Sequence, residues 1–174
     1  MNKARFTLAQ LNAMTRAEFV CVVGPVFEHS PWIAEAAWPQ RPFSTGEQLH
    51  TVLCRTVAAA QLEQQVALIT AHPDLVGRAA LQGTLLTPES KGEQVSAGLD
   101  TLSAEEIIAF QKSNAAYREK FGFPFVICAR LNKKEAILAG FSTRLNNMRE
   151  DEIQTALGEI YKIAQLRLRD LIST

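Results

Sequence analysis

Apolar residues recur at helical spacing through most of this chain. In the stretch 49–57 they stand three or four positions apart, and the same period runs along the whole of 150–171. The apolar face of this last stretch consists of Ile153, Leu157, Ile160, Ile163, Ala164 and Leu168. A stripe of this width is typical of an amphipathic helix that packs against a core. The pattern therefore predicts a protein built from helices.

One stretch departs from the helical pattern. Phe123–Arg130, reading FPFVICAR, is rich in β-branched and aromatic residues and contains a proline. Such a composition favours an extended backbone, and the proline leaves some backbone groups unpaired. We expect one short extended segment here, with backbone groups able to contact a ligand.

Polar residues mark where the helices begin and end. A capping box places a hydroxyl residue three positions before a Glu, and three such pairs open predicted helices: Thr15 with Glu18, Ser44 with Glu47, and Ser103 with Glu106. Thr87 followed by Pro88 predicts another start, while Gly24-Pro25 and Gly122 predict ends. The predicted helices are 8–14, 16–23, about 45–59, 62–72, 88–99, 104–121, 133–145 and 150–171. One or two further turns carry Trp32 and Trp38, and Arg78–Leu81 is a short connection.

Length and composition fit one folded unit. A chain of 174 residues with 47% hydrophobic content fills one core and is short for two. Neither an internal repeat nor a low-complexity linker interrupts it. We therefore predict an all-α fold, a single compact domain spanning residues 1–174, with about eight helices and one short extended segment.

The charge balance limits the classes of binding partner, and the cysteine content limits the cellular compartment. The chain carries 18 Lys plus Arg and 18 Asp plus Glu, so it has no excess charge to attract nucleic acid or anionic lipid. Its three cysteines, Cys21, Cys54 and Cys128, have no CxxC spacing and fit reduced thiols. No apolar run approaches about 18 residues, and Leu171–Thr174 is not a peroxisomal address. We expect a cytoplasmic protein that binds neither nucleic acid nor membrane.

Two polar clusters are candidates for chemistry. Pro73 lacks a backbone N–H and disfavours αR in the residue before it, so a helix is predicted to end at His72. The unperturbed imidazole pKa of about 6.5 suits proton transfer at neutral pH. About twenty residues later, Ser90, Glu93 and Gln94 gather near a predicted helix start. A His and a Glu from two segments are able to act as a proton-transfer pair.

Each candidate also has an ordinary structural explanation. His72 is placed to compensate a helix dipole, and Glu93 is placed to complete a capping box with Ser90. Arg144 is placed as one more cation near a helix C-terminus. Taken singly, each of the three residues favours the structural explanation. Their occurrence together is more informative about function than any one of them.

The combination resembles a known family. The blocks that carry the resemblance are FEHSPWIAEAAW from Phe27, AHPDLVGRAA from Ala71, LTPESKGEQVSAGLD from Leu86, NAAYREKFGFPFVICAR from Asn114, and Arg144-Leu145-Asn146. Together they resemble the OHCU decarboxylases of urate breakdown, which act on 2-oxo-4-hydroxy-4-carboxy-5-ureidoimidazoline. Several long blocks in the right order, over nearly the whole chain, are far more specific than a short motif. The resemblance implies an all-α, cofactor-free and dimeric enzyme that forms (S)-allantoin and CO2.

The resemblance also implies roles for nine residues. It makes His72 the catalytic acid or base, with Glu93 and Arg144 orienting and stabilising the substrate. It places the substrate-binding residues at Pro73, Ser90, Gln94, Phe125, Val126 and Ile127, the last three through their backbone groups. Planar and bidentate, an Arg fork suits a carboxylate or an oxyanion.

Two other classes of protein remain as alternatives. A non-catalytic helical module that binds a ureide or purine needs donors and acceptors but has no need of His, Glu and Arg together. A metal-dependent amidohydrolase needs closely spaced ligands. The three histidines, His29, His50 and His72, show neither HxH nor HExxH spacing. The sequence therefore favours the cofactor-free decarboxylase.

Overall fold

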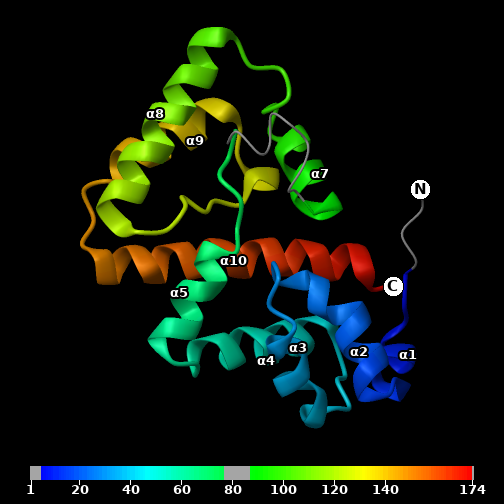
Figure 1. Ribbon diagram of the computed structural model, residues 1–174. Coiled ribbons are helices and arrows are strands. Elements are labelled where there is room, and N and C mark those ends of the chain that lie inside the picture. The colour runs from blue at the N-terminus through cyan, green and yellow to red at the C-terminus, as the bar shows by residue number, and fades with distance from the viewer. Residues whose placement is uncertain (1–4, 77–86, 174) are drawn as a thin grey trace. The chain divides into compact units, whose positions relative to one another are not determined.

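The protein is all-α, as predicted. The computed structural model describes residues 5–76 and 87–173 (Figure 1). These residues contain nine α-helices and three short 3-10 helices, and the β-type pairing among them is one isolated bridge between Phe6 and Ile172. None of the described helices is long and apolar enough to cross a bilayer. The predicted connection Arg78–Leu81 lies outside the described residues.

The chain divides into two compact units. Unit 1 comprises Met1–Ala71 and Tyr161–Thr174, and unit 2 comprises His72–Ile160. The last helix, α10 (Arg149–Leu171), begins in unit 2 and continues into unit 1. All nine predicted site residues belong to unit 2.

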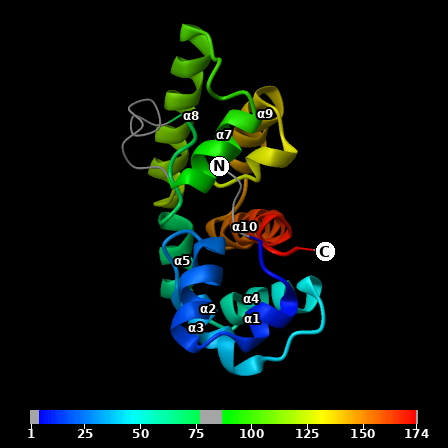
Figure 2. The same cartoon turned by 90° about the vertical axis from the view of Figure 1, so that its right-hand side faces the viewer.

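Unit 1 gathers the first five helices and the end of α10. These helices are α1 (Leu8–Ala13), α2 (Arg16–Val23), α3 (Trp32–Ala37), α4 (Gly46–Ala58) and α5 (Leu62–Thr70). Helix α3 packs against both α2 and α4 (Figure 2). The rings of Phe19 and Phe43 stack with centroids 6.1 Å apart. A buried ion pair joins Arg167 Nη1 to Glu28 Oε2 at 2.9 Å.

The start of α4 differs from the prediction. The N-cap is Thr45 instead of Ser44, and its hydroxyl accepts the Gln48 backbone N–H at 3.0 Å. The Ser44 hydroxyl and backbone N–H both donate to Gln48 Oε1, at 2.8 and 2.6 Å. The sequence contains two overlapping boxes, one residue apart, and only one of them can cap the helix. The predicted pairing of Ser44 with Glu47 is therefore wrong.

Unit 2 contains α7 (Pro88–Ser96), α8 (Ala104–Phe121), α9 (Lys134–Arg144) and the start of α10. Helices α8 and α9 pack side by side (Figure 1). The predicted capping box of Ser103 with Glu106 is present, and Gly122 ends α8 at φ +79°. Between these helices lies an aromatic core made of Phe110, Tyr117, Phe121, Phe123, Phe125 and Phe141.

Helix α7 ends earlier than predicted, at Ser96 instead of Leu99. Its N-cap is Thr87, as expected, with the hydroxyl accepting the Ser90 N–H at 3.2 Å. At the other end Gly98 adopts φ +77°, and its N–H donates to Val95 O at 2.9 Å. The Leu99 N–H donates to Gln94 O at 3.1 Å. This pair of bonds is a Schellman motif, which closes a helix at a left-handed glycine.

The predicted extended segment is shorter than expected. Residues 124–128 form neither helix nor strand, but the 3-10 helix η3 (Ala129–Leu131) follows at once. Phe125 stacks on Phe141 of α9 with centroids 3.8 Å apart. A Cβ at Gly140 of α9 would lie 3.3 Å from Phe125 Cζ, so glycine lets the segment approach this helix closely.

Candidate functional site

His72 lies directly beyond the end of a helix. Helix α5 ends at Thr70 with Ala71 as its C-cap, and Pro73 follows His72. The side chain of His72 is buried, with 6% of its surface exposed. Since Pro73 cannot continue a helix, the local sequence holds the imidazole at the point where the chain leaves α5.

Helix α8 holds the loop that follows His72. Asn114 Nδ2 donates to Leu75 O at 2.7 Å, and Arg118 Nε donates to the Asp74 carboxylate at 2.9 and 3.0 Å. Asn114 Oδ1 is buried and accepts no hydrogen bond within the described part of the chain. These contacts fix residues 74 and 75 relative to a long helix.

Val76, at the end of this loop, has a strained backbone. Its φ of +54° lies in the left-handed region, which a β-branched residue rarely adopts. Such a conformation costs on the order of 1–3 kcal/mol and persists where surrounding contacts impose it. The Val76 N–H donates to Gln94 Oε1 at 3.4 Å. Gln94 therefore joins the His72 loop to α7, and among residues 5–76 and 87–173 its Nε2 donors have no acceptor.

The predicted SxxEQ residues share helix α7. Ser90 and Gln94 are buried, and Glu93 is half-buried. Helix α7 packs against η3, which follows the extended segment. Burial raises the pKa of the Cys128 thiol, and the negative charges of Glu159 and Glu93 add to this rise. Helix α7, which contains Glu93, therefore packs against the turn that follows the segment of Phe125, Val126 and Ile127.

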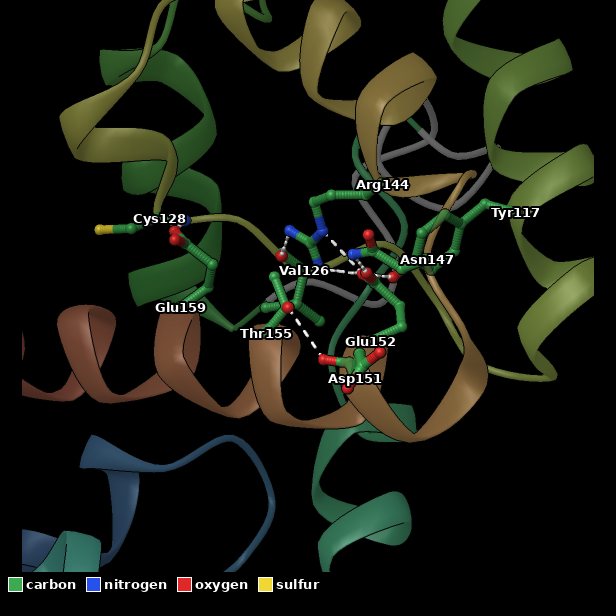
Figure 3. A network of polar contacts seen from close by, with 9 residues as sticks. All are labelled: Tyr117, Val126, Cys128, Arg144, Asn147, Asp151, Glu152, Thr155 and Glu159. Carbon is green, nitrogen blue, oxygen red and sulfur yellow. Dashed lines mark hydrogen bonds and ion pairs between the residues drawn. The ribbon is translucent and has the colours of Figure 1, made fainter.

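Arg144, the last residue of α9, is held by internal partners (Figure 3). Its side chain is buried, and Nη1 donates to Val126 O at 2.7 Å. Its Nε donates to Glu152 Oε1 at 2.7 Å, and Nη2 lies 2.5 Å from the same oxygen. The guanidinium also lies over the Phe125 ring, 4.3 Å from the centroid. The family resemblance assigns the Arg144 guanidinium to binding an anion of the substrate, but in the structure it binds groups of the protein.

Glu152 is the centre of this network. It stands in the first turn of α10 with 0% of its surface exposed. Besides Arg144, it accepts hydrogen bonds from the Tyr117 hydroxyl and from Asn147 Nδ2, the latter at 2.7 Å. Burial raises the pKa of Tyr117 far above its usual value, although Arg144 opposes the rise. The phenol therefore stays protonated and donates to the carboxylate.

The extended segment is fixed from two directions. The Val126 carbonyl accepts from Arg144, and the Cys128 N–H donates to Glu159 Oε2 at 2.8 Å (Figure 3). Ile127 lies between these two contacts and is half-buried. Within the ranges 5–76 and 87–173, neither its N–H nor its carbonyl has a hydrogen-bond partner. Within the described ranges, the N–H and the carbonyl of Ile127 therefore stay open between two anchored groups, the Val126 carbonyl and the Cys128 N–H.

Glu152, Tyr117 and Glu159 were not predicted. Each lies in a helix whose charged residues are mostly exposed. Composition alone therefore does not distinguish these three residues from the polar residues on the helix surface. A signal does exist for Glu152, which stands four residues before Ala156 and eight before Ile160 on the buried side of α10. A charged residue in phase with an apolar stripe indicates a buried ion pair.

The structure thus defines an all-α protein whose second unit contains the buried residues His72, Ser90, Gln94 and Arg144 and the half-buried Glu93. No group of three or more His, Cys, Asp or Glu suited to a metal occurs among the described residues. The profile of the family described as OHCU decarboxylase matches residues 12–169. The chain belongs to this family.

Individual relatives cover nearly the whole chain. A mouse protein named 2-oxo-4-hydroxy-4-carboxy-5-ureidoimidazoline decarboxylase is 44% identical over 165 residues, 95% of this chain and 92% of the relative. A protein of the same name from Haloferax volcanii is 42% identical over 168 residues, 97% of each chain. The crystal structure of an (S)-allantoin synthase matches with a TM-score of 0.78 and 29% identity, over 97% of this chain and 54% of that one.

Proposed function

We propose that this chain is a cofactor-independent carboxy-lyase of urate breakdown, which converts 2-oxo-4-hydroxy-4-carboxy-5-ureidoimidazoline to (S)-allantoin and CO2. The observation that carries the proposal is the burial of His72, Ser90 and Gln94 in one unit of a chain from this family. The names of the mouse and archaeal relatives support the same substrate.

The substrate itself provides the chemistry for losing CO2. The bond between the carboxylate and the ring carbon breaks, and its electron pair is accepted through the adjacent ring C=N, whose nitrogen takes a proton. The product of this step is an enol-like intermediate. Protonation of the ureido-bearing carbon, with loss of the hydroxyl proton, then gives allantoin. Delivery of that proton to one face sets the S configuration.

In this proposal His72 delivers or removes the proton. A buried imidazole whose position at a helix end is set by Pro73 is suited to act as a general acid or base. Glu93 accepts a hydrogen bond from the substrate hydroxyl or orients the imidazole. Ser90 and the Nε2 donors of Gln94 hold the ureido group and the ring edge. A site shielded from water strengthens each of these contacts.

The remaining proposed substrate contacts come from Pro73, Arg144 and the extended segment. Pro73 lines the site beside His72. Phe125, Val126 and Ile127 present backbone groups to the heterocycle, and the open N–H and carbonyl of Ile127 match the N–H and C=O edge of a cyclic ureide. Arg144 stabilises negative charge on the substrate with its positive charge and with the second N–H of Nη1, since its internal partners take the other four.

The assembly and the compartment are also proposals. Since the family profile spans residues of both units, we propose that residues 1–174 act as one domain. A homodimer and a cytoplasmic location are proposed from the family resemblance. Light scattering of the purified protein measures the first, and imaging of a tagged chain in its own cell measures the second.

The activity is tested by generating the unstable substrate from urate with the two upstream enzymes. Circular dichroism then follows allantoin in the presence and absence of this protein. Rapid appearance of one enantiomer is expected. A slow, racemic product identical to the blank would reject the enzyme and favour a helical module that binds a ureide or purine without turnover.

A further inference from the structure

We propose that Glu152 is a positioning residue, which orients the Val126–Ile127 peptide toward the substrate through Arg144 and Tyr117. The inference rests on the proposed function, since it assumes that the substrate meets the Ile127 backbone. It assigns a part in the reaction to a carboxylate that never touches the substrate. The argument starts from the geometry of the peptide bond.

A trans peptide unit is planar, and its C=O and N–H point in opposite directions. The Val126 carbonyl and the Ile127 N–H belong to the same unit. Because Arg144 Nη1 donates to Val126 O at 2.7 Å, the Ile127 N–H points away from the guanidinium. Fixing the carbonyl therefore fixes the direction of the donor.

The next peptide unit is held in the same way. The Cys128 N–H donates to Glu159 Oε2 at 2.8 Å, so the Ile127 carbonyl points away from that carboxylate. Helix α10 supplies both Glu159 and Glu152, seven residues apart on the same side of the helix. Two carboxylates of one helix thus set the directions of the Ile127 donor and acceptor, one through Arg144 and one directly (Figure 3).

Glu152 makes the first of these anchors rigid. A guanidinium bound only to a carbonyl would turn about its long side chain. Here Nε and Nη2 both meet Glu152 Oε1, and Nη2 also donates to the Tyr117 hydroxyl at 3.3 Å. Phe125 stacks beneath the guanidinium plane. With its plane held at several points, Arg144 holds the Val126 carbonyl in one direction.

The network is more elaborate than packing requires. Replacing a buried ion pair by apolar residues of similar volume is often neutral or stabilising, so a buried pair is weak evidence for stability. The Arg144–Glu152 pair also anchors the Val126 carbonyl, which lies next to the open Ile127 N–H. An apolar pair could not anchor a carbonyl. Orienting a hydrogen bond to the substrate is a use for such an anchor, since the loss of one such bond weakens binding by about tenfold to a hundredfold.

The test is Glu152→Gln, which keeps the shape of the side chain and removes its charge. The neutral amide keeps a single acceptor oxygen, and turning that oxygen toward Arg144 sets the amide NH2 against Asn147 Nδ2, so the guanidinium is held less firmly. We expect the Kd for (S)-allantoin and the KM for substrate generated in situ to rise by about tenfold to a hundredfold, as for the loss of one hydrogen bond. The value of kcat per folded molecule should change less than KM, because Arg144 keeps its charge in this variant and the Ile127 contact exists in both ground and transition states.

The matched control is Asp151→Asn, one residue away on the exposed side of the same turn. It removes one negative charge from α10 without touching the network, and it should leave Kd and KM unchanged. A merely structural Glu152 would lower Tm and the fraction of active molecules while leaving Kd and KM unchanged, and that result would overturn the proposal.

If Glu152→Gln fails to fold, a second variant, Tyr117→Phe, tests the positioning role of Glu152. Tyr117→Phe keeps the ring and removes one donor to Glu152 and one acceptor of Arg144. A rise in the Kd for (S)-allantoin of about fivefold is expected, and an unchanged Kd would overturn the inference. Wild-type protein without decarboxylase activity would instead reject the proposed function, so the two failures are distinct.

Discussion

Arg144→Lys separates three functions of the guanidinium: a helix-end cation, a substrate clamp and a backbone anchor. Lysine keeps the positive charge beside Glu152 but has a single ammonium in place of the fork. It therefore cannot reach Glu152 and Val126 O together with the geometry observed at 2.7 Å for each. The perturbation leaves the charge in place and removes the anchor.

The expected loss of stability follows from the Val126 carbonyl. With 3% of Val126 exposed, water does not replace the lost donor. A buried acceptor without a partner costs about 1–3 kcal/mol. For a chain of 174 residues, each kcal/mol lowers Tm by roughly 2–4 °C, so Tm should fall by roughly 2–12 °C. A helix-end cation would lose at most about 1 kcal/mol.

At temperatures where the Arg144→Lys variant is still folded, its activity should also be lower than that of the wild type. Loss of a donor that stabilises developing charge costs about 2–4 kcal/mol in kcat/KM. The assay combines thermal melts by circular dichroism with initial rates on substrate generated in situ. Arg55→Lys, an exposed position on α4, is the matched control and should change neither quantity.

The two measurements can contradict the reasoning separately. A lowered Tm with an unimpaired kcat/KM would remove Arg144 from the reaction and leave it as a structural anchor. A lowered kcat/KM with an unchanged Tm would mean that the fork is free for substrate and that the bond to Val126 O is dispensable. If the variant kept both the Tm and the kcat/KM of the wild type, the proposed roles of Arg144 as anchor and clamp would be refuted.

Two further predictions concern groups whose titration the fold suppresses. Burial raises the pKa of Cys54 to about 12, so at pH 8 about one thiol in ten thousand is ionised. Iodoacetamide followed by peptide mass spectrometry should therefore modify the exposed Cys21 well before Cys54, and equal rates would contradict this. Burial also raises the pKa of Tyr161 to about 12 and that of Tyr117 higher still. The folded protein should show little tyrosinate absorbance at about pH 10.5, guanidinium chloride should release it, and stability should fall above about pH 10, where only the unfolded chain loses these protons.

Local signals in the sequence predicted most of the helices. Thr15 with Glu18 and Ser103 with Glu106 form the boxes expected of them, and Gly122 ends α8. These features depend on residues within one turn of each other, so a short window of sequence contains all the information. The all-α fold followed from the same signals.

Two boundaries needed information that the pattern did not resolve. Ser44 and Thr45 each begin a box, and the choice between them depends on how Gln48 bonds in the folded chain. Gly98 interrupts the apolar pattern of α7 by turning left-handed, and the pattern alone gives no sign of φ. Competing local solutions of similar energy are settled by packing.

The sequence supplied candidate site residues but not the residues that hold them in place. The family resemblance supplied His72, Glu93 and the other candidates, since they stand in recognisable blocks. Glu152 stands among three consecutive acidic residues, and its burial depends on Arg144 and Tyr117, which are 8 and 35 residues away. Contacts over such separations are set by the fold, so sequence composition does not reveal them.

His72→Asn tests the central claim most directly, because asparagine keeps a polar side chain and removes the titrating imidazole. The measurement is the circular dichroism of allantoin formed from in situ substrate, with wild type and variant at equal concentration. The account predicts one enantiomer from the wild type and a rate about 10² to 10⁴ lower with the variant, whose product approaches the racemic blank. A variant that kept the wild-type rate and enantiomeric purity would contradict it.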